Sequence, residues 1–249
     1  MAAESKRLYV VLVETSNPLN IGAAARAMSN FGFLQLRVVN PYDVAFREAR
    51  SAVGAASTVL ANAEEYGSVA EAVAGCTLVV GTTAVRHREL HHPLRRLEYG
   101  GRLIRKELAT GRVALLFGTE KTGLSNDDLS HCHWLMNVPT REQHISMNLG
   151  QAVAVCLYEL MRHPKSAAPG KGTKPKKRAS SGELERISNV LLETLHLSGY
   201  VNPISVAATE ERVRRMVRRM DLSSKDAELW LGAYRQILWK VKSGGNGKK

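Results

Sequence analysis

Short apolar runs alternate with segments of helical spacing through the first two-thirds of the chain. Five such runs, several of them rich in β-branched residues, are typical of buried parallel strands, and they lie at residues 8–13, 36–39, 78–80, 113–117 and 134–138. Segments with helical spacing follow at residues 21–30, 45–53, 69–74, 99–109 and 148–162. The alternation predicts an α/β domain whose mostly parallel sheet carries helices on both faces.

The composition of the chain changes after residue 162. Residues 163–180 combine prolines and glycines with lysine and arginine and hold no acidic or large apolar residue, which predicts a flexible basic linker. Helical spacing then returns in three segments, at residues 184–195, 213–220 and 230–241. We therefore expect a sheet-containing domain at residues 1–162, the linker at 163–180 and a small helical module at 181–243.

Charge and cysteine content narrow the class of protein. The chain has 249 residues, 44% of them hydrophobic, and a formal net charge of +12, which favours polyanionic partners. Its three cysteines are widely spaced and odd in number, so they predict no disulfide framework. The first residues lack the apolar stretch of a secretion signal, and no apolar run reaches the ~20 residues that span a bilayer. We expect a soluble, cytoplasmic protein that does not enter a membrane.

Three polar segments follow predicted strands, where open parallel sheets bind ligands. In residues 14–26, Asn17 is placed to cap a helix that carries Gly22 and Arg26. Residues 117–124 contain two glycines around Glu120, and glycine permits close approach of a ligand or of the backbone. In residues 137–148, Ser146 precedes a long apolar helix that it is placed to cap. Each segment alone is also compatible with an ordinary turn.

Nucleotide-binding fingerprints are missing from these strand ends. The chain has neither the glycine pattern of dinucleotide-binding folds nor a P-loop, which argues against both of these cofactor sites.

Taken together and in this order, the three segments resemble the SPOUT methyltransferases, and more closely the TrmJ-like branch that methylates ribose in transfer RNA. The resemblance is most specific in the stretches at residues 11–16, 25–28, 116–120, 123–124 and 146–149. It implies a sheet whose carboxy-terminal part is threaded into a trefoil knot that forms a pocket for S-adenosylmethionine. It also implies a homodimer with both active sites at the interface.

The resemblance assigns roles to particular residues of this chain. The cofactor-binding residues that it implies are Thr82, Thr83, Ala84, Gly118, Glu120, Val138, Ile145, Ser146 and Met147. The catalytic residues are Arg26, Ser146 and Asn148, and Arg26 stands beside the acceptor ribose. Because a guanidinium is effectively never deprotonated, we expect Arg26 to orient the acceptor and stabilise negative charge rather than act as a base.

The predicted function is therefore S-adenosylmethionine-dependent 2′-O-methylation of a transfer RNA nucleotide. The anticodon loop is the expected target, because single-stranded regions let a protein splay out one nucleotide. Ribosomal RNA is an alternative substrate, and a non-catalytic RNA-binding protein with the same fold is another alternative. The presence of Arg26, Glu120, Ser146 and Asn148 argues against the non-catalytic alternative.

Other clusters invite different interpretations. The run His131, Cys132 and His133 has the wrong spacing for a structural zinc site, so we expect no metal. His144 lies near Ser146, but no G-x-S-x-G elbow accompanies them. The charged segment at residues 87–92 is interpreted either as a loop that folds over the site or as a plain solvated loop.

The arginine-rich segment of the helical module is amphipathic, and a membrane-surface role is one interpretation. Its apolar stripe lacks bulky aromatic anchors, so we favour packing within the module with the arginines facing RNA. Those arginines are Arg212, Arg215, Arg218 and Arg219.

Overall fold

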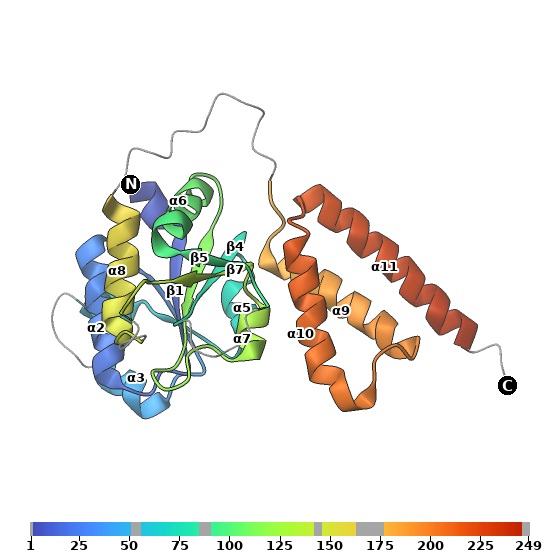
Figure 1. The fold of residues 1–249 in the computed structure, drawn as a ribbon, viewed down its shortest axis with the longest axis horizontal. Helices are drawn as coiled ribbons and strands as arrows, with labels where there is room; N and C mark the ends of the chain where they lie inside the picture. Colours follow the sequence, from blue (N-terminus) through green and yellow to red (C-terminus); the bar gives the residue numbers. More distant parts are fainter. Residues whose placement is uncertain (1, 51–55, 85–90, 142–145, 163–176, 246–249) are drawn as a thin grey trace, which may run out of the picture.

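The computed structural model describes residues 2–50, 56–84, 91–141, 146–162 and 177–245. Its centre is a seven-stranded sheet in the order β3-β2-β1-β6-β4-β7-β5 (Figure 1), in which every pair of neighbours is parallel. The strands are β1 (Leu8–Val13), β2 (Gln35–Val39), β3 (Glu64–Tyr66), β4 (Leu78–Thr82), β5 (Leu94–Arg96), β6 (Val113–Phe117) and β7 (Trp134–Asn137). The predicted α/β class and parallel sheet are confirmed.

Helices cover both faces of this sheet. They are α1 (Ala2–Ser5), α2 (Pro18–Phe31), α3 (Asp43–Arg50), α4 (Ser57–Ala61), α5 (Val69–Val73), α6 (Leu97–Leu108), α7 (Asn126–Ser130) and α8 (Leu149–Arg162). Helices α2, α3, α6 and α8 share one apolar core with the sheet, and α5 and α7 share a second core on the opposite face. Side chains of β1 alternate between the two cores, as the period of a strand requires. We call residues 2–162 the sheet domain.

Helices α2 and α8 pack closely at the end of the sheet where the strands finish. Gly150 lies so near α2 that an added Cβ would stand 2.6 Å from the Cβ of Ala23, a contact that only glycine avoids. The first turns of α2 and α8 are therefore brought side by side. This places the polar residues at the start of each helix within reach of one another.

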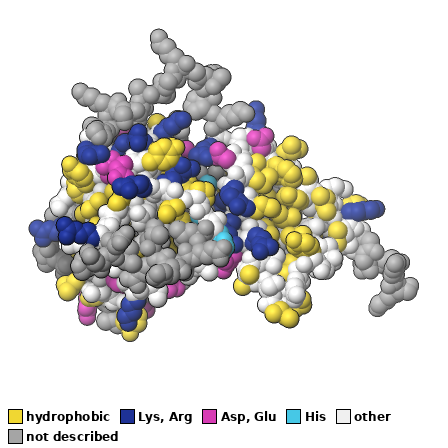
Figure 2. All heavy atoms as spheres, in the orientation of Figure 1, with side chains coloured by type: hydrophobic (Ala, Val, Ile, Leu, Met, Phe, Trp, Pro, Cys, Tyr) yellow, Lys and Arg dark blue, Asp and Glu magenta, His cyan; other side chains and the backbone are white. Residues whose placement is uncertain are grey.

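The remaining helices form a second body with its own core. It comprises α9 (Ser181–Leu197), the short 3-10 helix η2 (Pro203–Ser205), α10 (Val206–Arg219) and α11 (Ser224–Gly245). Ser180 and Glu183 form a capping box that begins α9. We call residues 177–245 the helical module. Figure 1 shows it beside α5 and α7, and Figure 2 shows hydrophobic side chains gathered on its surface. Large exposed apolar side chains of α11 are Leu229, Trp230, Ile237 and Trp239.

Backbone hydrogen bonds tie the helical module to the sheet domain. Ser181 donates its N–H to the Cys76 carbonyl oxygen at 2.7 Å, and Gly182 donates to that of Ala74 at 2.9 Å. Residues 177–180 were expected to belong to a flexible linker, but Lys177 accepts from Ser224 at 2.9 Å and is held against the start of α11. The rest of the expected linker, residues 163–176, lies outside the described residues.

Two further observations concern the described residues as a whole. Within them, no helix combines the length and the apolar character needed to cross a bilayer. Cys76, Cys132 and Cys156 are each buried and free.

Candidate active site

A cavity of about 580 Å³ opens at the carboxyl ends of β4, β6 and β7, next to the first turns of α2 and α8. Parallel sheets bind ligands at this edge. The segment after β4 is fixed there, because Thr83 donates its N–H to the Met136 carbonyl oxygen at 3.0 Å and accepts from the Asn137 side chain at 3.2 Å. The cavity is lined by Asn20, residues 82–84, residues 117–124, Leu129, Met136, Val138, Thr140, residues 146–149 and Ala152.

The loop after β6 folds back sharply on itself. Thr119 and Gly123 form an isolated bridge, in which Gly123 donates its N–H to the Thr119 carbonyl oxygen at 3.0 Å. A Cβ on Gly118 would stand 2.1 Å from the Gly123 carbonyl carbon, so only glycine fits at this position. The tight loop holds Glu120 at the cavity wall, facing the first turn of α2.

A chain of side-chain hydrogen bonds joins three separate segments at this wall. Asn148 donates from Nδ2 to Oδ1 of Asn20 at 2.8 Å, and Asn20 donates from its own Nδ2 to Oε1 of Glu120 at 2.9 Å. Oδ1 of Asn148 accepts from the Gly150 N–H at 2.9 Å. The start of α2, the loop after β6 and the start of α8 are thus locked together, with both amide groups oriented by their partners.

Most of the predicted site residues lie on this cavity. The structure brings together Thr82, Thr83, Ala84, Gly118, Glu120, Val138, Ser146, Met147 and Asn148. Ile145 and His144 lie outside the described residues, as does most of the charged segment at residues 87–92. Asn17 caps α2, as expected. The expectation that Ser146 caps α8 is wrong, because α8 begins at Leu149 and Asn148 supplies the capping oxygen.

Arg26 does not line the cavity within this chain. It lies on the exposed side of α2, and it forms no ion pair with any residue that the structure describes. Asn20, in contrast, was not predicted and lies at the centre of the polar chain. Its sequence signal was a lone amide in the first helical turn, three residues after the capping Asn17, in a helix otherwise made mainly of small and apolar residues.

The histidines beside Cys132 are structural. His133 accepts the Val79 N–H on Nδ1 at 3.1 Å, and burial lowers its pKa to about 3. His131 is also buried, and its pKa is lowered to about 4 by burial first and then by the charge of Arg218. Among the described residues, no three His, Cys, Asp or Glu side chains are grouped so that they could hold a metal ion.

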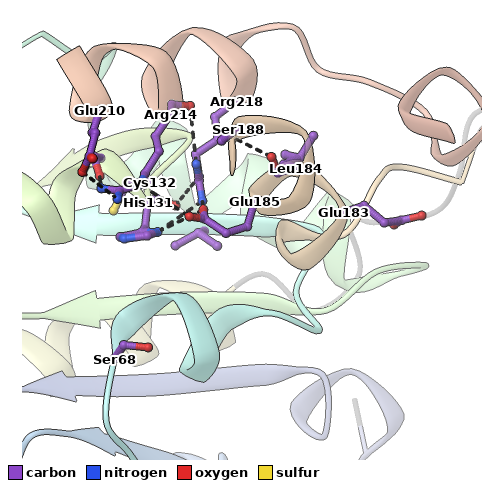
Figure 3. Close-up of polar contacts among 12 residues, drawn as sticks. Ser68, His131, Cys132, Glu183, Leu184, Glu185, Ser188, Glu210, Arg214 and Arg218 are labelled. Atoms are coloured by element: carbon purple, nitrogen blue, oxygen red, sulfur yellow. Dashed lines mark hydrogen bonds and ion pairs between the residues drawn. The ribbon is translucent and has the colours of Figure 1, made fainter. Parts of the chain in front are cut away.

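Arg218 has a role different from the expected one. Its side chain does not face solvent, because the residue is only 2% exposed and lies between α10 and α7, where its Nε donates to the His131 carbonyl oxygen at 3.0 Å (Figure 3). It therefore cannot contact RNA in this arrangement. Arg212 and Arg219 are exposed, as expected.

Comparisons with known proteins agree with this fold along nearly the whole chain. The model of the SpoU rRNA Methylase family matches residues 7–158. The tRNA (cytidine/uridine-2′-O-)-methyltransferase TrmJ of Cronobacter sakazakii is 32% identical over 98% of this chain and 99% of its own. The tRNA (cytidine/uridine/adenosine-2′-O-)-methyltransferase TrmJ of Pseudomonas aeruginosa is 35% identical over 91% of each chain. The crystal structure of TrmJ from Z. mobilis superposes with a TM-score of 0.79 at 32% identity, covering 92% of this chain and 98% of that one.

Proposed function

This chain belongs to the SpoU rRNA Methylase family, and we propose that it is an S-adenosylmethionine-dependent transfer RNA 2′-O-ribose methyltransferase. The observation that carries the proposal is the polar chain from Asn148 through Asn20 to Glu120, which closes three loops around one cavity at the strand ends. Both curated relatives are named as transfer RNA 2′-O-methyltransferases, and they align with the helical module as well as with the sheet domain.

The cavity suits the proposed cofactor in size and in lining. Its volume of about 580 Å³ falls within the range of small-molecule sites, and such sites combine apolar walls with a few placed polar groups. Leu124, Met136 and Val138 supply apolar wall, while Thr83 and Gly118 supply backbone groups at strand ends. When bound, the cofactor supplies the methyl group, so the protein must chiefly bind and orient the acceptor.

The acceptor is a ribose hydroxyl, a poor nucleophile that must lose its proton as it attacks. We assign Ser146 and Asn148 to positioning of the ribose or cofactor, because both lie on the cavity wall. Arg26 would stabilise the negative charge that grows on the acceptor oxygen and hold the neighbouring phosphate. Positioning of this kind accounts for much of the rate in group transfer.

The place of Arg26 on the outer side of α2 gives it a natural role across a dimer interface. We propose that the chain forms a homodimer and that Arg26 of one subunit serves the cavity of the other. Two exposed apolar side chains on the adjacent helices α2 and α8 support such an interface. They are Leu19 on α2 and Tyr158 on α8. The trefoil knot that the resemblance implies belongs to this proposal, as do the cofactor-binding roles assigned above, including that of Ile145.

The target is proposed to be a nucleotide of the anticodon loop, where a base can be unstacked and its ribose presented to the cavity. The helical module would add affinity through contacts to the phosphate backbone, which a formal net charge of +12 favours.

The experiment is a methylation assay with purified full-length protein, labelled S-adenosylmethionine and two substrates, unmodified transfer RNA and ribosomal RNA. We expect label in a 2′-O-methylated nucleotide of transfer RNA, located by nuclease digestion and mass spectrometry. Label in ribosomal RNA alone would establish the alternative substrate. Cofactor binding with no transfer to either RNA would favour a non-catalytic RNA-binding protein.

A further inference from the structure

Helix α10 divides its arginines between two faces. Arg214 and Arg218, four residues apart, share one face and are here called the inner arginines. Arg212, Arg215 and Arg219 follow the spacing of three and four residues on the adjacent face and are here called the outer arginines.

The inner arginines dock α10 onto α7 (Figure 3). Arg214 donates from Nη1 to Oδ1 of Asp127 on α7 at 2.7 Å, and Arg218 donates from Nε to the carbonyl oxygen of His131, which follows α7, at 3.0 Å. Within the helical module, Arg218 also donates from Nη2 to Oε2 of Glu185 on α9 at 2.9 Å. The Arg218 side chain is 1% exposed, so its charge depends on Glu185 and the His131 carbonyl for compensation. A buried, paired charge permits few alternative arrangements. The position of α10 on the sheet domain is therefore fixed, and the outer arginines are fixed with it.

The outer arginines remain available to an external partner. Arg212 and Arg219 are exposed and form no ion pair with any residue in the described part of the chain. Arg215 is partly covered and is paired with Glu211 at 3.3 Å within the same helix. In Figure 2, Lys, Arg and His side chains gather where the helical module meets the sheet domain.

This face lies beside the cavity of the sheet domain. The pKa of His92 is lowered to about 4, by burial first and then by the positive charge of Arg215, with a smaller contribution from Arg219. Helix α10 packs against α7, where Arg214 contacts Asp127 at 2.7 Å, and Leu129 of α7 lines the cavity. The outer arginines therefore lie on a helix that packs directly against the cavity-lining helix α7.

We infer that the outer arginines bind the sugar–phosphate backbone of the substrate RNA where it passes beside the cavity, and that the inner arginines set their position. This inference rests on the proposed function. In this arrangement the helical module is not an RNA-binding tail on a flexible linker; it forms one rigid RNA-binding surface together with the sheet domain. Guanidinium groups suit this role because they bind phosphate oxygens in a bidentate manner.

A phospholipid surface would also attract these charges, but both valines of the apolar face of α10 are already buried. Val213 and Val217 are buried in the core of the helical module, against α9. A helix that lies in a bilayer interface needs its apolar face free to enter the lipid. The arrangement thus favours RNA over membrane.

The test compares two double variants of the full-length protein with the same change in charge. Arg212→Gln/Arg219→Gln removes two outer arginines, and Arg235→Gln/Lys240→Gln removes two exposed cations of α11 that form no ion pair among the described residues. Binding of unmodified transfer RNA is measured between 50 and 200 mM salt. The salt slope is the slope of the logarithm of the binding constant against the logarithm of the salt concentration. In the outer-arginine variant, which loses two phosphate contacts, we expect its magnitude to fall by roughly 1.5 and the affinity for transfer RNA to fall on the order of tenfold.

The control variant should keep the wild-type slope, and both variants should bind S-adenosylmethionine like the wild type. An unchanged slope in the outer-arginine variant, or an equal loss in both variants, overturns the inference. Binding to phosphatidylglycerol vesicles that is lost in the outer-arginine variant, with transfer RNA binding unchanged, overturns it in favour of membrane. Failure of the proposed function itself is distinct, because the wild-type protein would then methylate no transfer RNA.

Discussion

Polar side chains gather both at the cavity and at the junction between α10 and α7, but the two regions differ in how far these side chains are exposed to solvent. At the cavity, Asn20, Glu120 and Asn148 form a hydrogen-bonded chain that remains open to solvent. At the junction, Arg218 is withdrawn from water, donates to the His131 carbonyl oxygen after α7 and is paired with Glu185 of α9. Polar groups at an open wall can exchange partners with a ligand, whereas buried and fully paired groups specify one arrangement. The cavity is therefore organised to bind a ligand, and the junction is organised to fix the helical module on the sheet domain.

The sharpest way to break this comparison is to remove the charge that holds the junction. Arg218→Met leaves Glu185 in a partly buried site with only the longer contact from Arg214, whose Nε lies 3.4 Å away, and loss of one member of a buried ion pair costs about 3–5 kcal/mol. Because Arg214 remains beside Glu185, we expect the free energy of unfolding, measured by urea titration, to fall by about 3 kcal/mol, at the lower end of this range. The KM for transfer RNA should rise, while kcat at saturating RNA changes little.

The double variant Arg218→Met/Glu185→Leu provides the control for this prediction. Replacing both members of a buried pair with apolar residues is often neutral, so most of the lost stability should return. A loss below about 1 kcal/mol in Arg218→Met, well under the range for a buried pair, would mean that the junction does not depend on this charge.

Unlike the buried and paired Arg218, Arg26 is exposed and forms no ion pair with any described residue. If it acts on charge that appears only in the transition state, Arg26→Ala should keep the fold and the cofactor affinity but lose roughly 10² or more in single-turnover rate. Arg26→Lys should recover only part of the rate, because an ammonium keeps the charge without the planar fork. Near-normal rates in Arg26→Ala at saturating RNA and cofactor would assign activation of the acceptor elsewhere.

Loss of the polar chain at the cavity should have a smaller effect than loss of Arg26, and the effect should be on cofactor affinity. Asn20→Ala removes two hydrogen bonds at once and frees both Glu120 and Asn148, each bond contributing about 1 kcal/mol. We expect cofactor affinity, measured by calorimetry, to fall by about tenfold. Asn30→Ala, at the other end of the same helix, is the matched control and should bind normally. Equal affinities in the two variants would show that the chain does not shape the pocket.

The two regions also differ in how far the sequence predicts them. Most cavity residues, though not Asn20, were predictable, because the carboxyl ends of parallel strands meet at one edge and the family resemblance assigns roles to the segments that follow them. The strands β3 and β5 were not predicted, since each has three residues and no buried apolar alternation. Helical spacing in the sequence also predicts which residues of α10 share a face, but it does not predict which other element packs against each face. Arg218 meets His131, which is 87 positions away, so no local pattern marks it as buried.

The smallest expected effect concerns the pH dependence of the junction. His131, which directly follows α7, faces Asp127 on that helix, Glu185 on α9, and Arg214 and Arg218 on α10. Burial first, and then the charge of Arg218, lower its pKa in the native state to about 4, against 6.5 for an ordinary histidine. The unfolded chain therefore takes up a proton before the native protein does. The contribution of His131 to stability is fully present above pH 6.5 and is lost as the pH falls towards 4.

Because other buried histidines titrate in the same direction, the measurement is the difference in pH dependence between two variants. Between pH 7 and pH 6, a single histidine of this kind accounts for less than about 1 kcal/mol of the free energy of unfolding. His131→Gln should remove that share and flatten the fall in stability on acidification, whatever it does to stability at pH 7. His196→Gln, which removes an exposed imidazole of α9 away from the junction, is the matched control variant. If the two variants kept the same slope, His131 would be as free to take up a proton in the native protein as in the unfolded chain. The junction would then admit water and an added charge, unlike the closed, ion-paired arrangement described above.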